Sequence, residues 1–323
     1  MSGRRAKKVA VVPGDGIGPE VIESALSVLD AAGAEFEKVL VEVGFGRWKR
    51  TGVALSDDDL ALMKECDCIL FGAITTPSDP NYRSVLLRLR KELDLYANVR
   101  PFSSPDLDFI IVRENTEGLY SGLEEIGEEE SRTLRVITRR GSERIAEKAC
   151  DLAAARRRLT IVHKSNVLKS DRLFLKTCQA AAERRSVPFD DMLVDSAAYN
   201  LVIRPQQFDV LVTTNLFGDI LSDEAAGIVG SLGLCASANI GDRYALFEPI
   251  HGSAPDIAGK GIANPVGAIR SAAMMMEWLG CPETAKRIMA AVQTSLHDGK
   301  KTPDLGGGCN TQEVTAAIRE CLI

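Results

Sequence analysis

The sequence lacks the features that mark zinc-finger, nucleic-acid-binding and membrane proteins. Only 3 of its 323 residues are histidine, and none of its 8 cysteines forms a CxxC pair, so no structural zinc site is expected. The formal net charge is −6, whereas a protein that binds a nucleic-acid duplex needs a basic face. No apolar run approaches the length that spans a bilayer. Nucleic acid and membrane are therefore not expected as partners.

The N-terminal segment also lacks a long apolar stretch. Its apolar run at 9–12 has the length of a strand, so no signal peptide is expected. The scattered cysteines are then expected to be reduced and mostly buried, in a cytoplasmic protein. Hydrophobic residues make up 45% and charged residues 26%, as in ordinary globular proteins, and the length favours two domains.

Short apolar runs alternate with segments of helical pattern along the chain. Strands are predicted at 9–12, 68–71, 109–112, 159–163 and 210–213. Helices are predicted at 19–32, 57–65, 142–155 and 171–184. This alternation is typical of an α/β fold with a substantially parallel sheet.

A glycine-rich turn, PGDGIG at 13–18, follows the first predicted strand. Its glycines have the spacing GxGxG instead of the GxGxxG of a Rossmann dinucleotide site, and no acidic residue closes a second strand at the usual distance. We interpret the motif as a tight turn between strand and helix. A dinucleotide site would have to be formed elsewhere.

Two aspartates, Asp219 and Asp223, follow the apolar strand predicted at 210–213. On a helix this spacing places both carboxylates on one face, where they repel each other by a few tenths of a kcal/mol. A hard cation such as Mg²⁺ or Mn²⁺ would offset the repulsion. Taken alone, the pair is more often a charge at a helix N-terminus and a solvated acid. Three arginines at predicted strand ends, Arg90, Arg100 and Arg113, could grip the carboxylates of a small acid, although scattered arginines are usually solvated or paired.

Six motifs resemble those of the β-decarboxylating dehydrogenases, which act on isopropylmalate, isocitrate, homoisocitrate or tartrate. They are GDGIGPEV at 14–21, LRKELDLYANVRP at 89–101, RENTEGLY at 113–120, HKSNVLK at 163–169, TTNLFGDILSDEAAG at 213–227 and FEPIHGSAPDIAGKGIANP at 247–265. They occur in family order over nearly the whole chain. The resemblance implies an isopropylmalate/isocitrate dehydrogenase-like α/β fold, different from the Rossmann fold, with a cleft between a domain of 1–98 plus 230–323 and a domain of 99–229.

The resemblance also implies a homodimer, possibly paired into a tetramer, with shared active sites. Lys164 and Asp195 are expected from the neighbouring subunit, and Asp195 becomes the third metal carboxylate. Lys164, its pKa lowered by metal and arginines, is the expected general base for a C2 alcohol. Tyr120 is expected to protonate the carbon left by loss of CO₂, with surrounding cations favouring its phenolate. A catalytically silent regulatory subunit is a minor alternative, since such a chain would be expected to lose one of these residues.

The expected cofactor is NAD. Asp256 stands where NAD-using members place an acid against the ribose, and a carboxylate there repels the 2′-phosphate of NADP. Small residues at 252–254 allow close approach of backbone to a nucleotide, and Asn264 offers both senses of hydrogen bond to adenine. The full set of expected NAD contacts is Ile74, Thr75, Asn166, Glu248, His251, Gly252, Ser253, Ala254, Asp256, Ile257 and Asn264.

The substrate's C3 substituent is expected to contact the segment 81–90. If that segment is helical, Arg83, Leu86, Leu87 and Arg90 share one face. Homoisocitrate enzymes resemble the segment best, with Arg83 or Arg88 meeting a distal carboxylate. Isopropylmalate enzymes present an apolar pocket, which Leu86 and Leu87 also fit, and isocitrate enzymes carry a serine at the position of Ser84. Equally, Ser84 could be a helix N-cap and both extra arginines solvated.

Overall fold

The computed structural model describes residues 6–322. Its contacts divide the chain into two compact units. Unit 1 comprises residues 1–93, 230–238 and 242–323, and unit 2 comprises 94–229 and 239–241. The boundary predicted after residue 98 therefore falls inside a strand of unit 2.

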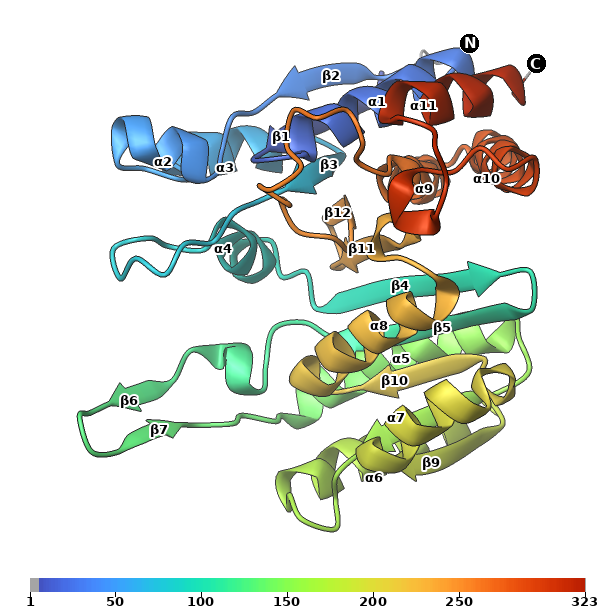
Figure 1. Cartoon of the computed structure of the whole chain (residues 1–323). Coiled ribbons are helices and arrows are strands. Elements are labelled where there is room, and N and C mark those ends of the chain that lie inside the picture. Colours follow the sequence, from blue (N-terminus) through green and yellow to red (C-terminus); the bar gives the residue numbers. More distant parts are fainter. Residues whose placement is uncertain (1–5, 323) are drawn as a thin grey trace. The chain divides into compact units, whose positions relative to one another are not determined.

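Unit 1 is a layer of strands with helices packed on it (Figure 1). Its strands have the spatial order β2 (Glu37–Leu40), β1 (Lys8–Gly14), β3 (Cys68–Ala73), β12 (Ala245–Pro249) and β11 (Ala236–Ile240), and the last two residues of β11 belong to unit 2. Parallel pairing joins β2 to β1, β1 to β3 and β3 to β12. The helices of unit 1 are α1 (Gly18–Ala31), α2 (Phe45–Thr51), α3 (Asp57–Lys64), α4 (Val85–Glu92), α9 (Val266–Trp278), α10 (Pro282–His297), α11 (Thr311–Glu320) and the 3₁₀ turns η3 (Leu232–Leu234) and η4 (Pro303–Leu305).

Unit 2 has strands in the order β4 (Ala97–Ser104), β5 (Leu107–Glu114), β10 (Val210–Thr213), β8 (Leu159–His163) and β9 (Phe189–Leu193). All its neighbours pair in parallel except β4 and β5, which form an antiparallel hairpin. A separate hairpin of β6 (Glu124–Ile126) and β7 (Ser131–Thr133) projects from the rest of unit 2 (Figure 1). The remaining elements are α5 (Arg139–Ala154), α6 (Ser170–Arg184), α7 (Val194–Ile203), α8 (Asn215–Val229), η1 (Leu119–Ser121) and η2 (Pro205–Gln207).

The predicted strands and helices are confirmed as parts of these elements. β8 and β10 have the predicted bounds, and the five predicted strands read as continuous apolar runs because they are buried in parallel sheets. One prediction is wrong: Arg83 does not share a helical face with Leu86, Leu87 and Arg90. The helix α4 begins at Val85 and Ser84 caps it, so Arg83 lies before the helix. In the described part of the chain no helix is both long and apolar enough to cross a membrane.

All eight cysteines are free thiols, as predicted. Five of them are buried, namely Cys66, Cys68, Cys150, Cys178 and Cys235. Complete burial raises the pKa of the Cys178 thiol well above its usual value, so this thiol stays protonated and packs as a small apolar side chain.

Candidate active site

Three side chains of unit 2 contact the carboxylate of Asp219. Arg113 donates from Nη1 to its Oδ1 at 2.5 Å, and Nη1 of Arg100 lies 3.6 Å from the same oxygen. The hydroxyl of Tyr120 donates to Oδ2 at 2.6 Å. Both arginines are buried, Arg113 with only 1% of its side chain exposed. Asp219 lies in the second turn of α8, so it is not the N-terminal helix charge of the alternative interpretation.

Arg113 is fixed by the start of α8. Its Nε donates to the Asn215 carbonyl at 2.8 Å, and its Nη2 donates to Oδ1 of the Asn215 side chain at 2.7 Å. The helix can approach because residue 218 is glycine: a Cβ there would lie 2.7 Å from Cβ of Arg113. In the motif FGD, Gly218 thus allows the helix to pack against Arg113, and the next residue, Asp219, supplies the carboxylate that Arg113 binds. Asn215 was not among the predicted site residues, and only its place in the motif could have indicated it.

The loop between Arg113 and Tyr120 is held by buried polar groups. The Glu114 carboxylate accepts from the backbone N–H groups of Thr116 and Glu117 at 2.8 Å each. The Asn115 amide donates to the Leu95 carbonyl at 2.9 Å. These contacts explain why RENTEGLY carries polar residues that face no solvent: they shape the turn that brings Tyr120 back to Asp219.

The phenol of Tyr120 differs from the expectation of a favoured phenolate. Partial burial raises its pKa, the hydrogen bond and charge of Asp219 raise it further, and Arg113 only partly opposes them. The nearby cation does stack, with Cζ of Arg113 5.1 Å from the ring centroid. Arg113 thus acts in the expected direction, but burial and Asp219 outweigh it, so the neutral phenol, a proton donor, is favoured.

The donor chemistry around Asp219 and Asp223 fits a hard divalent cation. Partial burial raises the pKa of Asp223, the charge of Asp219 adds to the rise, and Arg100 and Arg113 oppose it. The two carboxylates are therefore close enough to disfavour each other's charge, a strain that a bound cation relieves. No group of three or more acidic, cysteine or histidine side chains suited to a metal occurs within residues 6–322. Asp195 of the same chain thus does not complete the site.

Lys164 and Asp195 form their own pair in unit 2. Nζ of Lys164 lies 2.6 Å from Oδ1 of Asp195, and this hydrogen bond lowers the pKa of the Asp195 carboxyl. The backbone of Lys164 is anchored, because its N–H donates to the fully buried Asp171 at 2.7 Å and Asp171 is paired with Arg135 at 2.6 Å. Sequence reasoning missed Asp171 and Arg135. Asn166 lies exposed in the turn after Lys164.

The predicted cofactor segments of unit 1 follow neighbouring parallel strands. Ile74 and Thr75 come directly after β3, and the loop at 251–257 comes after β12. In open α/β sheets ligands bind beyond the carboxyl ends of such strands. The two loops touch, since the hydroxyls of Thr75 and Ser253 lie 2.7 Å apart.

The 251–257 loop has two features of a ligand-binding loop, a buried polar atom and a strained backbone. Nε2 of His251 is buried and has no hydrogen-bond partner within the described chain, and burial lowers the pKa of this histidine. Ala254 has a φ of 39°, a left-handed conformation that strains a residue with a Cβ. A Cβ at Gly252 would meet only open space. An unpaired ring nitrogen beside strained backbone fits a polar nucleotide group, and Asp256 and Ile257 lie in the turn that follows.

Asn264 is placed differently from its predicted role. Its side chain is buried and already used by its own chain: Nδ2 donates to Asp304 at 3.0 Å and Oδ1 accepts from the Val266 N–H at 3.0 Å. One donor hydrogen and one lone pair remain for a ligand.

Arg90 and Glu248, predicted to contact substrate and cofactor, meet each other in unit 1. Nη2 of Arg90 lies 3.4 Å from Oε1 of Glu248, and both side chains are about nine-tenths buried. Nε of Arg90 has no hydrogen-bond partner within the described chain. The guanidinium therefore keeps donors for a ligand carboxylate.

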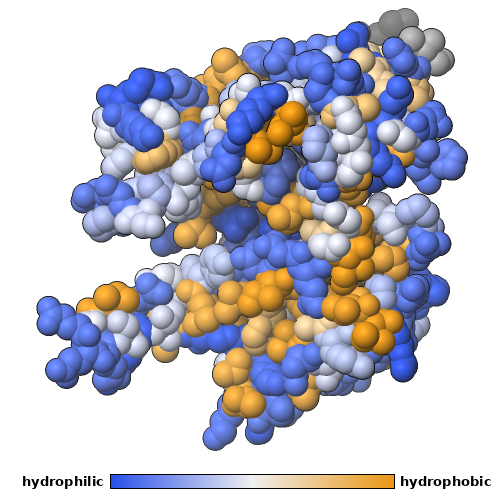
Figure 2. Space-filling model, viewed as in Figure 1, coloured by the Kyte–Doolittle hydropathy of each residue, from blue (hydrophilic) through white to orange (hydrophobic). Residues whose placement is uncertain are grey.

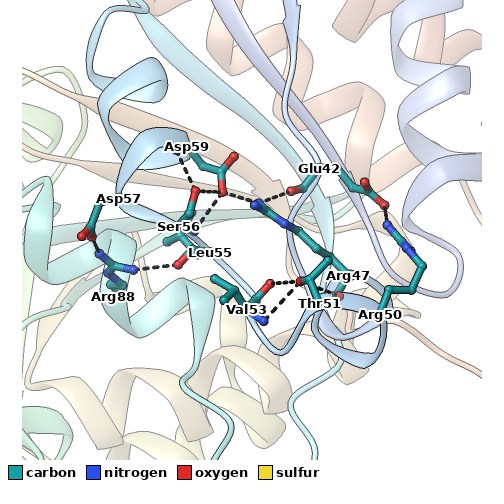
Figure 3. A network of polar contacts seen from close by, with 10 residues as sticks. All are labelled: Glu42, Arg47, Arg50, Thr51, Val53, Leu55, Ser56, Asp57, Asp59 and Arg88. Carbon is teal, nitrogen blue, oxygen red and sulfur yellow. Dashed lines mark hydrogen bonds and ion pairs between the residues drawn. The ribbon is translucent and has the colours of Figure 1, made fainter.

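The helix α4 is tied to the start of α3 through Arg88. This arginine pairs with Asp57 and donates to the Leu55 carbonyl at 2.7 Å (Figure 3). It is therefore paired within its own chain, although about a third of its side chain is exposed. Arg83, in contrast, is exposed and forms no hydrogen bond or ion pair within the described residues. Ser84 is the N-cap: its hydroxyl oxygen accepts from the Leu87 N–H, and its own hydrogen stays available.

The whole chain matches known dehydrogenases. A family model described as isocitrate/isopropylmalate dehydrogenase matches residues 8–318. The chain belongs to this family. It is 47% identical to a homoisocitrate dehydrogenase of Methanocaldococcus jannaschii, over 95% of each chain. It is 45% identical to a 3-isopropylmalate dehydrogenase of Archaeoglobus fulgidus, over 98% of this chain and 99% of the other.

Among solved structures, the isocitrate dehydrogenase from Methylococcus capsulatus superposes with a TM-score of 0.93 at 45% identity, covering 98% of this chain and 99% of the other. Membership in the isocitrate/isopropylmalate dehydrogenase family confirms the predicted fold class and shows that the protein is an oxidoreductase. Relatives with three different substrates have nearly the same identity, so identity alone does not select the acid.

Proposed function

We propose that the protein catalyses the NAD-dependent, Mg²⁺- or Mn²⁺-dependent oxidative decarboxylation of a 3-substituted malate. The observation that carries the proposal is the cluster on Asp219, where a carboxylate beside Asp223 is shared by two buried arginines and a tyrosine. Guanidinium groups hold carboxylates of a substrate, and the aspartate pair supplies oxygen ligands for a cation. Such a set has little use in a protein that only binds nucleotides.

For each step of the proposed reaction, the chain contains a side chain that could carry it out. Arg90, Arg100 and Arg113 would bind the carboxylates of the acid. Lys164 would be the general base that takes up the C2 hydroxyl proton, and a bound nicotinamide would accept the C2 hydride. When the bond from C3 to its carboxylate breaks and CO₂ leaves, its electron pair remains on the substrate, and the neutral phenol of Tyr120 donates the proton that C3 takes up. A divalent cation held by Asp219, Asp223 and Asp195 would supply Lewis-acid stabilisation of the C2 oxygen.

NAD is the proposed cofactor, bound by the loops that follow β3 and β12, with Asn166 completing the predicted set. The buried Nε2 of His251 and the strained backbone at Ala254 support a ligand on this loop. Asp256 is exposed two residues further on. Its carboxylate can accept from both hydroxyls of a ribose and would repel a 2′-phosphate, which favours NAD over NADP.

A homoisocitrate-type acid is the proposed substrate, with 3-isopropylmalate and isocitrate as alternatives. Arg83 supports an acid with a distal carboxylate, because this exposed guanidinium has no partner within the described residues and stands next to the cap of α4. Leu87 is 44% exposed and Leu86 half-buried, so an aliphatic portion of the substrate could cover them.

A homodimer is proposed on the basis of the exposed apolar surface of unit 2. Figure 2 shows hydrophobic side chains gathered over α7 and α8. Tyr199, Val202 and Ile203 of α7 and Ile220 of α8 are each more than half exposed. Monomeric proteins rarely leave such a patch uncovered. In the proposed dimer Lys164 and Asp195 enter the site of the other subunit, where Asp195 would be the third carboxylate.

An absorbance assay for NADH tests the proposal. The purified protein is incubated with Mg²⁺, NAD and homoisocitrate, 3-isopropylmalate or isocitrate in turn, and Asp219→Asn serves as the inactive control. We expect NADH formation that requires the metal and is fastest with homoisocitrate. No turnover with any of the three acids contradicts the reaction, and faster turnover of another acid contradicts only the substrate.

A further inference from the structure

The glycine turn at 13–18 has no role in the proposed reaction, yet its aspartate is densely bonded. The Asp15 carboxylate accepts three backbone N–H groups: Phe45 at 2.8 Å and Thr75 at 3.1 Å on Oδ2, and Gly46 at 2.8 Å on Oδ1. Phe45 and Gly46 are the first two residues of helix α2, and Thr75 belongs to the segment proposed to bind NAD. A half-buried carboxylate with three amide donors is a fixed point of the structure.

The same turn is bonded to the second NAD segment. The Ile17 N–H donates to the Ser253 carbonyl at 2.9 Å, and the Ser253 hydroxyl lies 2.7 Å from that of Thr75. Ser253 and Thr75 are therefore joined twice, directly through their hydroxyls and indirectly through the turn. The turn, Thr75 and Ser253 form one closed set of contacts, which we call the Asp15 junction.

The glycines of the motif make the junction possible. Gly14 has a φ of 77°, and a Cβ on it would lie 1.9 Å from the Ala73 carbonyl oxygen. Gly16 has a φ of 60°, and a Cβ on it would lie 1.9 Å from the Ser253 carbonyl oxygen. Neither position accepts a side chain without moving the backbone of a segment proposed to bind NAD. The spacing GxGxG is thus explained by close approach to two other loops and not by a nucleotide phosphate.

We propose that Asp15 is a positioning residue for NAD: it fixes the backbone of Thr75 and, through the junction, that of Ser253, before the cofactor arrives. The inference rests on the proposed function, because it assumes that these two segments bind NAD. Asp15 is not assigned a contact with the cofactor. Its effect on binding comes from preorganising loops that would otherwise have to be ordered when NAD binds.

The variant Asp15→Asn tests this proposal. Asparagine has one acceptor oxygen and turns its NH₂ group toward at least one of the three N–H donors, so the junction loses a bond without losing volume. Asp59→Asn is the matched control. Asp59 also anchors α2, by pairing with Arg47, and accepts from the Ser56 N–H at 2.8 Å, but no contact joins it to Thr75. Both variants therefore loosen α2, and only Asp15→Asn loosens Thr75.

Three measurements are made on the full chain: the dissociation constant of NAD by calorimetry, the KM values for NAD and acid, and hydrogen exchange of the 73–76 backbone without NAD. We expect Asp15→Asn to weaken NAD binding about tenfold, as for one lost hydrogen bond to a charged group, and to raise the KM for NAD more than that for the acid. Exchange at 73–76 should accelerate. Asp59→Asn should change NAD binding less than about twofold.

Unchanged NAD binding in Asp15→Asn, or an equal loss in Asp59→Asn, would overturn the proposal. If wild-type protein does not bind NAD, the proposed function fails at that point. The exchange measurement then still decides whether Asp15 orders Thr75, and unchanged exchange refutes it. If Asp15→Asn does not fold, Ser253→Ala removes the hydroxyl contact of the junction. Faster exchange at 73–76 then supports the junction, and wild-type exchange rejects it.

Discussion

Asp219 and Asp209 are both bonded to arginines, but the rest of their partners differ in kind. Asp219 is bonded to side chains that could also reach a ligand, namely Arg100, Arg113 and Tyr120. Asp209, by contrast, accepts backbone N–H groups of Arg157 at 2.5 Å and Arg158 at 3.1 Å and pairs with Arg156 at 3.1 Å. The first arrangement leaves charge to be shared with a substrate or metal, and the second fixes the turn before β8.

Asp209→Asn is expected to lower the free energy of unfolding by about 1–3 kcal/mol at pH 7, the usual effect of breaking buried hydrogen bonds to a charged group. Burial raises the pKa of Asp209, but the three hydrogen bonds outweigh burial and lower it overall. A lowered folded-state pKa means that the stabilisation is present above the usual aspartate pKa of about 3.9 and is lost as pH falls below it. The gap between wild type and variant, measured by urea unfolding, should therefore shrink as the pH falls below the usual aspartate pKa.

The control for this prediction is Asp190→Asn, because the one ion pair of Asp190 within residues 6–322 is a partly exposed contact with Arg158 at 3.4 Å. An exposed pair contributes about 0–1 kcal/mol. Equal destabilisation by the two substitutions, or a gap for Asp209→Asn that is independent of pH, would contradict this account.

Asp219, which sequence reasoning found, and Asp15, which it missed, differ in the kind of partner they have: side chains for Asp219 and backbone N–H groups for Asp15. Asp219, Tyr120 and Lys164 stand in long motifs and were named from resemblance. Asp15 was passed over because its partners Phe45, Gly46 and Thr75 are 30 or more residues away and offer only backbone N–H groups, which leave no mark in a sequence. The bond of Tyr120 to Asp219 was also not visible in the sequence, where only the nearby arginines could be counted.

Among the elements, buried parallel strands were the easiest to predict, because burial on both faces produces continuous apolar runs such as LTIVH in β8. Strand β4 was not predicted, since ANVRPFSS places an arginine and a proline within it. Helix α4 was extended too far toward the N-terminus. A helical period would place Arg83 on one face with Leu86, Leu87 and Arg90, but the hydroxyl of Ser84 caps the helix, which begins at Val85.

The start of α4 at Val85 separates the roles of two arginines: Arg83 precedes the helix and Arg88 lies within it. Arg83 is without a partner in the described chain, so Arg83→Ala should hurt turnover of an acid with a distal carboxylate more than turnover of 3-isopropylmalate. The expected difference in kcat/KM is about 10- to 100-fold, the range for one charge-assisted hydrogen bond. The measurement is the ratio of kcat/KM values for homoisocitrate and 3-isopropylmalate. An unchanged ratio would remove Arg83 from substrate selection.

Arg88→Met should behave differently, because Arg88 holds α4 to Asp57 and the Leu55 carbonyl (Figure 3). We expect KM to rise severalfold for every acid alike, as a loosened helix presents Ser84 and Leu87 less well. The affinity for NAD should change little. A loss confined to acids with a distal carboxylate would instead mean that Arg88 leaves Asp57 to contact the substrate.

At the scale of the whole molecule, the described part of one chain does not bring together the three carboxylates of the proposed metal site. Within residues 6–322 no three-carboxylate group is formed, and Asp195 is paired with Lys164 of its own chain. The exposed apolar side chains of α7 lie on the helix that also carries Asp195. Covering that surface with a second copy would bury it and deliver Asp195 and Lys164 to the partner together, so dimerisation and metal binding should be linked.

Mixing two inactive variants tests this sharing of residues. Lys164→Met and Asp219→Asn are each expected to be inactive alone. If Lys164 serves the other subunit, a mixed dimer contains one site in which both residues are intact and one in which both are replaced. Random reassociation of equal amounts makes half of the dimers mixed, so the mixture should recover about a quarter of wild-type activity. If each subunit used its own Lys164, every site would lack one of the two residues and the mixture would stay inactive. Native mass spectrometry checks that mixed dimers form. If they form and the mixture shows no activity, the active site is not shared between subunits.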